Sequence, residues 1–202
     1  VLGKISVEIA KKYGCDAIAH GSTGKGNDQV RFEGYILTHE PSMKIIAPVR
    51  EWLMDRNEEI KYAKKHGIPV PASIDFPYSD DDNMWGITWE GGEITDPSII
   101  VPVEKFLTTY TLPKNAPDEE ELVKIEFKKG IPIALNGEKL SLANLIVKLN
   151  NISGKHGVGT FQILEDRIIG LKNRGVYEHP AAQVIVEAHK NLEKYVSTKV
   201  EN

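Results

Sequence analysis

The segment Ala17–Glu33, with the sequence AIAHGSTGKGNDQVRFE, carries most of the fold prediction and indicates a strand, a loop and a helix in that order. Ala17–Ala19 is a short apolar run that favours a strand, and the three glycines within residues 21–26 allow a tight turn and a close approach of a ligand to the backbone. Asn27 or Asp28 stands where a helix cap is expected. Because backbone N–H groups at such a loop and helix start are unpaired and electropositive, the segment predicts a site for a phosphate or carboxylate group.

The glycine spacing alone leaves a second interpretation open. It matches neither the phosphate-loop pattern G-x-x-x-x-G-K-[ST] nor the dinucleotide pattern G-x-G-x-x-G, so a glycine-rich surface turn is the alternative. The polar residues that follow favour a ligand site. Asn27 and Arg31 are four positions apart and share one helix face, with Asp28 beside them, and Lys25 adds a positive charge within the loop.

The first 50 residues predict part of a parallel α/β sheet. An amphipathic helix opens the chain, with Leu2, Ile5 and Ile9 on its expected buried face and Gly14 as its stop. A second strand is expected at Met43–Ala47. The order helix, strand, loop, helix, strand is typical of the last units of such a sheet, whose ligands lie beyond the carboxyl ends of the strands.

The composition changes near residue 69, and we expect a domain boundary between residues 1–68 and residues 69–202, with residues 69–77 as the linker. Ser79–Asn83 predicts an acidic turn, for which a solvated surface is preferred over a cation site. Residues 84–92 are rich in aromatic and β-branched side chains and predict a strand.

Antiparallel hairpins and two helices are predicted for the rest of the chain. The strands expected to pair are 122–127 with 131–135, and 158–164 with 168–172, which places Tyr177 beyond the second hairpin. Two helices are predicted from apolar residues that recur every three or four positions and so lie on one helix face. The first begins near Ser141 with Leu142, Leu145, Ile146 and Leu149, and the last begins at Pro180 with Ile185, Ala188, Leu192 and Tyr195.

The amino-acid composition and net charge limit the kinds of partner and metal site that can be expected for this chain. The chain has 202 residues and a formal net charge of −4 with acids and bases interspersed, so neither a nucleic acid nor an anionic membrane is expected as a partner. Its single cysteine, Cys15, excludes an internal disulfide and fits a reducing compartment, so a cytoplasmic location is expected. The six histidines show no metal-ligand spacing on one helix, and no metal site is predicted in the chain.

The block His20–Phe32, HGSTGKGNDQVRF, closely resembles the signature of the argininosuccinate synthase family. Further blocks similar to this family extend the resemblance over nearly the whole chain. They are Pro77–Ser79 (PYS), Ile125–Pro132 (IEFKKGIP), Gly154–Gly159 (GKHGVG) and Gly170–Glu178 (GLKNRGVYE).

The resemblance implies an α/β fold: the end of a parallel nucleotide-binding α/β sheet (residues 1–68), then an α+β synthetase domain with antiparallel hairpins and a long C-terminal helix (residues 69–202). Members of the family begin with a strand and a Ser-Gly-Gly-x-Asp-Thr-Ser loop that holds pyrophosphate. No such loop occurs in this sequence. We therefore expect that this chain lacks the N-terminal part and the C-terminal tail of the family, and that it is inactive when isolated.

The implied activity is that of an ATP-dependent ligase of arginine biosynthesis. It joins citrulline to aspartate through a citrullyl-adenylate and releases argininosuccinate, AMP and pyrophosphate, with Mg²⁺ accompanying ATP. The resemblance also implies a homotetramer. Two alternatives remain: another ligase that cleaves ATP to pyrophosphate and adenylates its substrate, and a non-catalytic binding or assembly module derived from this fold.

Carried over position by position, the resemblance assigns the ligand contacts. Gly21 and Lys25 are assigned to ATP; Thr23, Asn27 and Asp28 to aspartate; and Asn27, Arg31, Ser79, Thr88, Glu165 and Tyr177 to citrulline. Asn27, Asp28 and Arg31 form the expected catalytic group. The family usually has serine at the position of Thr88, which retains the hydroxyl and adds a methyl group. Each residue also has a structural interpretation: Arg31 pairing with a surface acid, Tyr177 in the core, and Glu165 as a turn acid.

Overall fold

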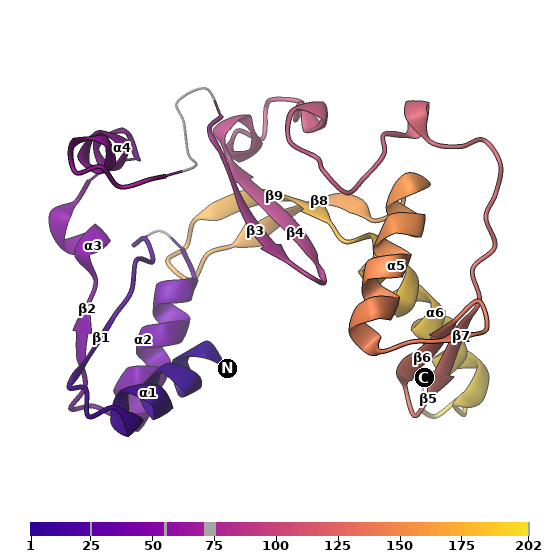
Figure 1. Cartoon of the computed structure of the whole chain (residues 1–202), viewed down its shortest axis with the longest axis horizontal. Coiled ribbons are helices and arrows are strands. Elements are labelled where there is room, and N and C mark those ends of the chain that lie inside the picture. The colour runs from indigo at the N-terminus through magenta and orange to yellow at the C-terminus, as the bar shows by residue number, and fades with distance from the viewer. Residues whose placement is uncertain (25, 55, 71–75, 202) are drawn as a thin grey trace. The chain divides into compact units, whose positions relative to one another are not determined.

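A computed structural model describes residues 1–24, 26–54, 56–70 and 76–201, and the chain divides into two compact units (Figure 1). Unit 1 comprises Val1–Pro77 and Glu165–Asn173, and unit 2 comprises Tyr78–Leu164 and Arg174–Asn202. The predicted α/β class is confirmed, since a parallel strand pair, two antiparallel sheets and a C-terminal helix are all present. Residues 71–75 of the predicted linker lie outside the described residues.

Unit 1 has the predicted strand, loop, helix and strand. Its elements are α1 (Leu2–Lys12), β1 (Ala17–Ala19), α2 (Asp28–His39), β2 (Lys44–Ile46), α3 (Pro48–Trp52) and α4 (Arg56–Lys65). Strands β1 and β2 pair in parallel, with Ile18 opposite Ile45. The crossover between them through α2 is the arrangement that parallel pairing requires, and it places the glycine-rich loop at the carboxyl end of β1.

The predicted buried face of α1 is wrong. Leu2, Ile5 and Ile9 are exposed, with 62%, 43% and 51% of their surface accessible. The buried residues are instead Gly3, Val7 and Ala10, which pack toward α2. At Gly3 an added Cβ would lie 2.9 Å from the Cβ of Tyr35, so the two helices approach closely on the side where α1 carries small residues. Residue size, rather than hydrophobicity alone, selects the contact face.

Unit 2 is built on two antiparallel sheets and two helices. In chain order its main elements are β3 (Tyr78–Asn83), β4 (Gly86–Gly91), β5 (Ile125–Lys128), β6 (Ile131–Leu135), β7 (Glu138–Lys139), α5 (Leu142–Lys155), β8 (Thr160–Asp166), β9 (Lys172–Glu178) and α6 (Pro180–Val196). Short 3₁₀ turns lie at Gly92–Thr95, Val103–Lys105 and Pro113–Asn115. The strand orders are β3-β4-β9-β8 and β5-β6-β7.

Two boundaries in the first sheet correct the sequence predictions. The acidic segment Ser79–Asn83 is strand, paired along β4, and the turn comes after it, where the side chain of Asn83 accepts from the N–H of Trp85. The second hairpin turns at residues 167–171, later than predicted, so Tyr177 lies within β9 and not beyond the hairpin. Pairing with a neighbouring strand has overridden local turn preference in both places.

Two apolar cores hold unit 2. One lies on the inner face of the first sheet and contains Tyr78, Ile87, Trp89 and Val176 with residues of the segment 94–107. The other packs α5 and α6 against β5 and β6. In α5, Leu145, Ile146 and Leu149 are buried as predicted, whereas Leu142 is half exposed. In α6 the buried residues lie in the first turns and include Ile185 of the predicted stripe, whereas Leu192 and Tyr195 of that stripe are exposed.

A buried carboxylate ties β9 to the segment that follows the first core. Glu178 is fully buried, and its oxygens accept from the indole N–H of Trp89 at 2.6 Å and from the backbone N–H groups of Thr108, Thr109 and Tyr110 at 2.7–3.1 Å. Several donors converging on both oxygens replace the water that the carboxylate loses on burial. This contact fixes the end of β9.

The contacts of a second acidic residue of unit 2, Glu93, predict that the stability of the fold depends on pH. Hydrogen bonds from Lys105 and from the buried Tyr78 lower the pKa of Glu93 from 4.5 to about 2. A carboxyl group whose pKa is lower in the folded state stabilises it above its ordinary pKa, and that stabilisation disappears as the pH falls through the folded value. We therefore expect Glu93→Gln to have a lower free energy of unfolding than the wild type at about pH 6. The difference between the two free energies should decrease as the pH falls from 4.5 to about 2.

Urea unfolding across this pH range measures the difference in the free energy of unfolding. The control is Glu104→Gln, which changes an exposed acidic residue of the same unit. A difference between Glu93→Gln and the wild type that does not change with pH would contradict the assignment.

Candidate functional site

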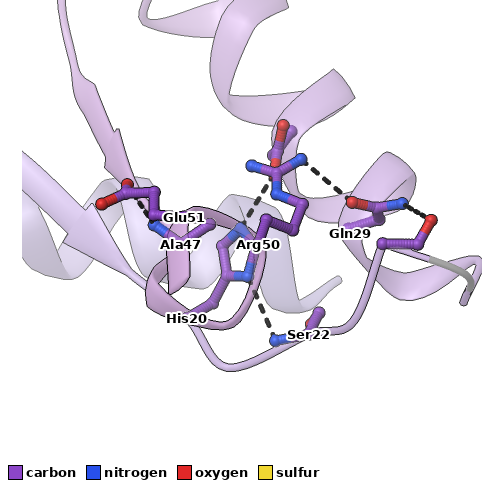
Figure 2. Close-up of polar contacts among 8 residues, drawn as sticks. His20, Ser22, Gln29, Ala47, Arg50 and Glu51 are labelled. Atoms are coloured by element: carbon purple, nitrogen blue, oxygen red, sulfur yellow. Dashed lines mark hydrogen bonds and ion pairs between the residues drawn. The ribbon is translucent and has the colours of Figure 1, made fainter. Parts of the chain in front are cut away.

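The glycine-rich loop leaves the carboxyl end of β1 and enters α2 (Figure 2). The N–H of His20 still donates to the carbonyl of Ile46 on β2, so the loop proper begins at Gly21. An added Cβ at Gly21 would meet nothing within 4 Å, and Gly21 is exposed, which leaves room for a ligand over its backbone. Thr23 is also exposed, and Lys25 lies outside the described residues.

Asn27 occupies the N-cap position of α2, as predicted, but its side chain does not cap the helix. Instead, its Oδ1 accepts from the N–H of Ile168 at 2.8 Å, and its Nδ2 donates to the carbonyl of Asp166 at 3.4 Å. Asp166 is the last residue of β8 and Ile168 lies in the turn that follows it, and both belong to unit 1. An asparagine amide has two donors and two lone pairs, so the side chain retains one of each for a ligand.

The first turn of α2 carries an exposed ion pair. The guanidinium of Arg31 lies 3.1 Å from the carboxylate of Asp28, and both side chains are more than half exposed. Arg31 thus forms the ion pair with a surface acid that its structural interpretation predicts. That acid is Asp28, which the family resemblance assigns to the aspartate site. An exposed pair of this kind is readily exchanged for contacts with a charged ligand.

Glu165 lies in the same unit, directly before the residue whose carbonyl accepts from Asn27. It is half-buried and forms the penultimate residue of β8, consistent with the strand end expected from the sequence. Unit 1 therefore brings the loop, the first turn of α2 and the carboxylate-bearing end of β8 together.

In unit 2 the remaining predicted residues share one face of a sheet. Thr88 on β4 lies directly opposite Tyr177 on β9 and opposite Asp81 on β3. Ser79 is two residues from Asp81, and because side chains alternate along a strand it lies on that same face. The opposite face is the one that packs into the core. The sheet thus gathers Ser79, Thr88 and Tyr177, which are far apart in sequence.

Tyr177 is held among aromatic rings that sequence reasoning missed. The ring of Phe161 stacks on it with centroids 5.4 Å apart, and the ring of His179 meets it edge-on, also at 5.4 Å. The tyrosine ring lies over Gly175, where an added Cβ would be 3.1 Å from it. Burial lowers the pKa of His179 and thereby favours the neutral form of its ring. Tyr177 and His179 are two residues apart at the end of β9 and the start of α6, and this spacing was the signal that could have revealed the contact.

The glycine-rich loop offers space for an anionic group. Exposed loop N–H groups and an open space at Gly21 suit phosphate groups. Across residues 1–24, 26–54, 56–70 and 76–201 no cluster of three or more histidine, cysteine or acidic side chains could hold a metal ion. Within the same described stretches no helix combines the length and apolar character of a membrane span.

Comparisons with known proteins agree over both units. Residues 1–69 match the Arginosuccinate synthase N-terminal HUP domain, and residues 78–202 match the Arginosuccinate synthase C-terminal domain. A protein named argininosuccinate synthase from Streptococcus suis (strain 05ZYH33) is 54% identical over 193 residues, which are 96% of this chain and 48% of that protein.

A protein of the same name from Symbiobacterium thermophilum is 51% identical over 96% of this chain and 48% of its own length. Another, from Geobacillus sp. (strain WCH70), is 50% identical over 98% of this chain and 49% of its own length. The chain thus spans about half the length of the curated relatives that it matches. Two domain matches that together cover most of the sequence, and identities at this level, show that the chain belongs to the argininosuccinate synthase family.

Proposed function

We propose that this protein is an ATP-dependent ligase that joins citrulline and aspartate to give argininosuccinate, AMP and pyrophosphate. The observation that carries the proposal is the gathering of Asn27, Asp28 and Arg31 at the first turn of α2, beside an exposed glycine-rich loop and the end of β8. Family membership supports the same reaction. In this proposal residues 1–68 belong to the nucleotide-binding domain and residues 69–202 to the synthetase domain, and the assembly is a homotetramer.

The first step activates a poor leaving group. The ureido oxygen of citrulline attacks the α-phosphorus of ATP, the bond from this phosphorus to the bridging oxygen breaks, and pyrophosphate leaves. Loop N–H groups near Gly21 would hold the nucleotide, together with Lys25. Magnesium bound with ATP would neutralise charge on the departing pyrophosphate. The guanidinium of Arg31 would orient citrulline, since it offers a rigid fork of donors.

The second step forms the new carbon–nitrogen bond. The amine of aspartate attacks the activated ureido carbon, AMP leaves, and the amine loses a proton. Thr23 and Asn27 would bind the aspartate carboxylates with hydroxyl and amide donors. The carboxylate of Asp28 would hold the attacking amine and favour its correct orientation. Both steps depend on positioning and charge neutralisation, and neither needs a covalent bond to the protein.

The far end of citrulline would lie along the sheet face of unit 2. Ser79, Thr88 and Tyr177 present hydroxyl groups on that face. Glu165, which belongs to unit 1, is proposed as the carboxylate for the α-ammonium group. The rings of Phe161 and His179 restrict the orientation of Tyr177. A rigid tyrosine hydroxyl costs little conformational entropy when it binds a ligand.

The direct test uses the protein expressed from its complete gene. With ATP, magnesium, citrulline and aspartate we expect stoichiometric AMP and argininosuccinate, and no product when any one substrate is omitted. Product formation with another nucleophile in place of aspartate would favour a different adenylating ligase. Ligand binding without turnover would favour a non-catalytic module.

Asp28→Asn tests the assignment of the amine. We expect overall turnover to fall on the order of 10²-fold, while the exchange of pyrophosphate into ATP with citrulline present changes little, because the side chain serves the second step. Asp16→Asn changes an exposed carboxylate of the same unit and is the control. An exchange rate that falls as far as turnover would refute the role.

A further inference from the structure

Both ends of the glycine-rich loop are hydrogen-bonded to side chains that are themselves linked. At the first end, the N–H of Ser22 donates to Nδ1 of His20 at 3.3 Å, and Nε2 of the same ring lies 3.0 Å from Oε1 of Glu33 (Figure 2). Since Nδ1 accepts a hydrogen bond, the proton of the neutral ring is on Nε2, which donates to the carboxylate. Helix α2 therefore holds the first part of the loop through His20.

The other end is held from the same helix. Nε2 of Gln29 donates to the carbonyl of Gly24 at 2.6 Å, and Oε1 of Gln29 accepts from the guanidinium of Arg50 at 3.0 Å. A second guanidinium nitrogen of Arg50 lies 2.5 Å from Oε1 of Glu33. The two sets of contacts meet at Glu33, so four side chains join Ser22 to Gly24 and close a ring through the loop backbone. We call these side chains the loop ring: His20, Glu33, Arg50 and Gln29.

The loop ring is more sheltered than the loop that it holds. Gln29 is 7% exposed, and the side chains of His20, Glu33 and Arg50 are 10%, 19% and 36% exposed. Hydrogen bonds in such surroundings are stronger than in water, and each member has a fixed direction. A reversed Gln29 amide would place its NH₂ against the guanidinium and its oxygen against a carbonyl, so the ring specifies one arrangement.

The anchored residues alternate with the residues proposed to bind ligands. Ser22 and Gly24 are hydrogen-bonded to the loop ring through their backbones, and Gly21 and Thr23, which directly precede them, are exposed. A loop whose donors are fixed in place before the ligand arrives loses less conformational entropy on binding.

We propose that His20, Gln29, Glu33 and Arg50 are positioning residues, which hold loop 21–24 in its ligand-binding shape and thereby set the affinity for ATP and aspartate. The identity of these two ligands rests on the proposed function. The ordering of the loop does not, so the two can be tested separately.

The substitution Gln29→Glu tests the hydrogen bond from Gln29 to the loop most directly. It keeps the shape of the side chain and an acceptor for Arg50, but it replaces the donor to the Gly24 carbonyl by an oxygen that repels it. The loss of one hydrogen bond predicts about fivefold faster amide hydrogen exchange in the peptide covering residues 21–24, and KM values for ATP and aspartate that rise about fivefold while kcat changes less than twofold. Gln183→Glu, on the exposed face of α6, makes the same charge change and should alter neither quantity.

Two variants of His20 separate its two contacts. The amide nitrogen of His20→Gln can replace Nε2 and keep the bond to Glu33 while losing the acceptor for Ser22; the oxygen of His20→Asn can replace Nδ1 and keep that acceptor. We expect His20→Asn to restore most of the exchange protection of the loop that His20→Gln loses.

Unchanged exchange in both Gln29→Glu and His20→Gln would overturn the proposal. Faster exchange with unchanged KM values would overturn it as well, because loop order would then not set affinity. A wild-type protein that forms no argininosuccinate would refute the proposed function, while the exchange data would still decide whether the loop ring orders the loop.

Discussion

Glu178→Gln is expected to lower the free energy of unfolding of unit 2 by about 3 kcal/mol, one of the two largest effects predicted for this chain. Both carboxylate oxygens accept from N–H groups, including Trp89 on one oxygen and Thr109 and Tyr110 on the other. A glutamine must place its NH₂ against one of these sets of donors, whichever way the amide is turned. Buried N–H groups then lose their acceptor, and each such loss is costly.

Urea unfolding followed by tryptophan fluorescence measures this effect, because the indole of Trp89 contacts the substituted group. The control is Glu119→Gln, an exposed acid in the same unit, which should change stability by less than about 0.5 kcal/mol. A loss below about 1 kcal/mol for Glu178→Gln would show that the segment around Thr108–Tyr110 rearranges to satisfy its own donors.

Arg31→Ala is expected to lower kcat/KM for citrulline about a hundredfold, equivalent to about 2.7 kcal/mol of transition-state binding. The guanidinium is exposed and pairs with an Asp28 carboxylate that is exposed to a similar degree. Removing it should therefore change the stability of the fold little and weaken citrulline binding strongly. Arg31→Lys keeps the charge but loses the planar fork, and should recover only part of the activity.

Steady-state kinetics with citrulline varied at saturating ATP and aspartate measure this loss. Lys12→Ala removes an exposed cation from the same unit and serves as the control. A decrease of only about threefold would exclude Arg31 from the citrulline site, since an exposed surface charge can produce an effect of that size. Unchanged unfolding behaviour of Arg31→Ala would show that the loss does not arise from the fold.

Short-range features could be predicted from the residues alone. The strand, loop and helix of Ala17–Glu33, the hairpin of β5 and β6, and Pro180 at the first turn of α6 all follow from local backbone chemistry. Lys129 and Gly130 both adopt positive φ angles in the turn of that hairpin, as a tight turn between such strands requires. The predicted site residues rest on the family resemblance, and the structure adds how they are grouped.

Features that depend on partners distant in sequence were missed or misplaced. The acidic segment after Tyr78 is a strand because β4 pairs with it, and Tyr177 belongs to β9 because the hairpin turns later than local preference suggested. The side chain of Asn27 is hydrogen-bonded to the end of β8 and to the turn after it, more than 130 residues away, and does not cap its own helix. No local pattern contains such contacts.

Local sequence patterns were enough to predict the element types of the glycine-rich segment, the turn and helix-start signals, and the family to which the chain is similar. The tertiary structure alone decided that α1 packs through Gly3, that Thr88 faces Tyr177, and that the loop ring closes on Glu33. The physical reason is that turns and helix starts depend on neighbouring φ and ψ angles, whereas register, contact faces and buried polar networks depend on which surfaces exclude water together.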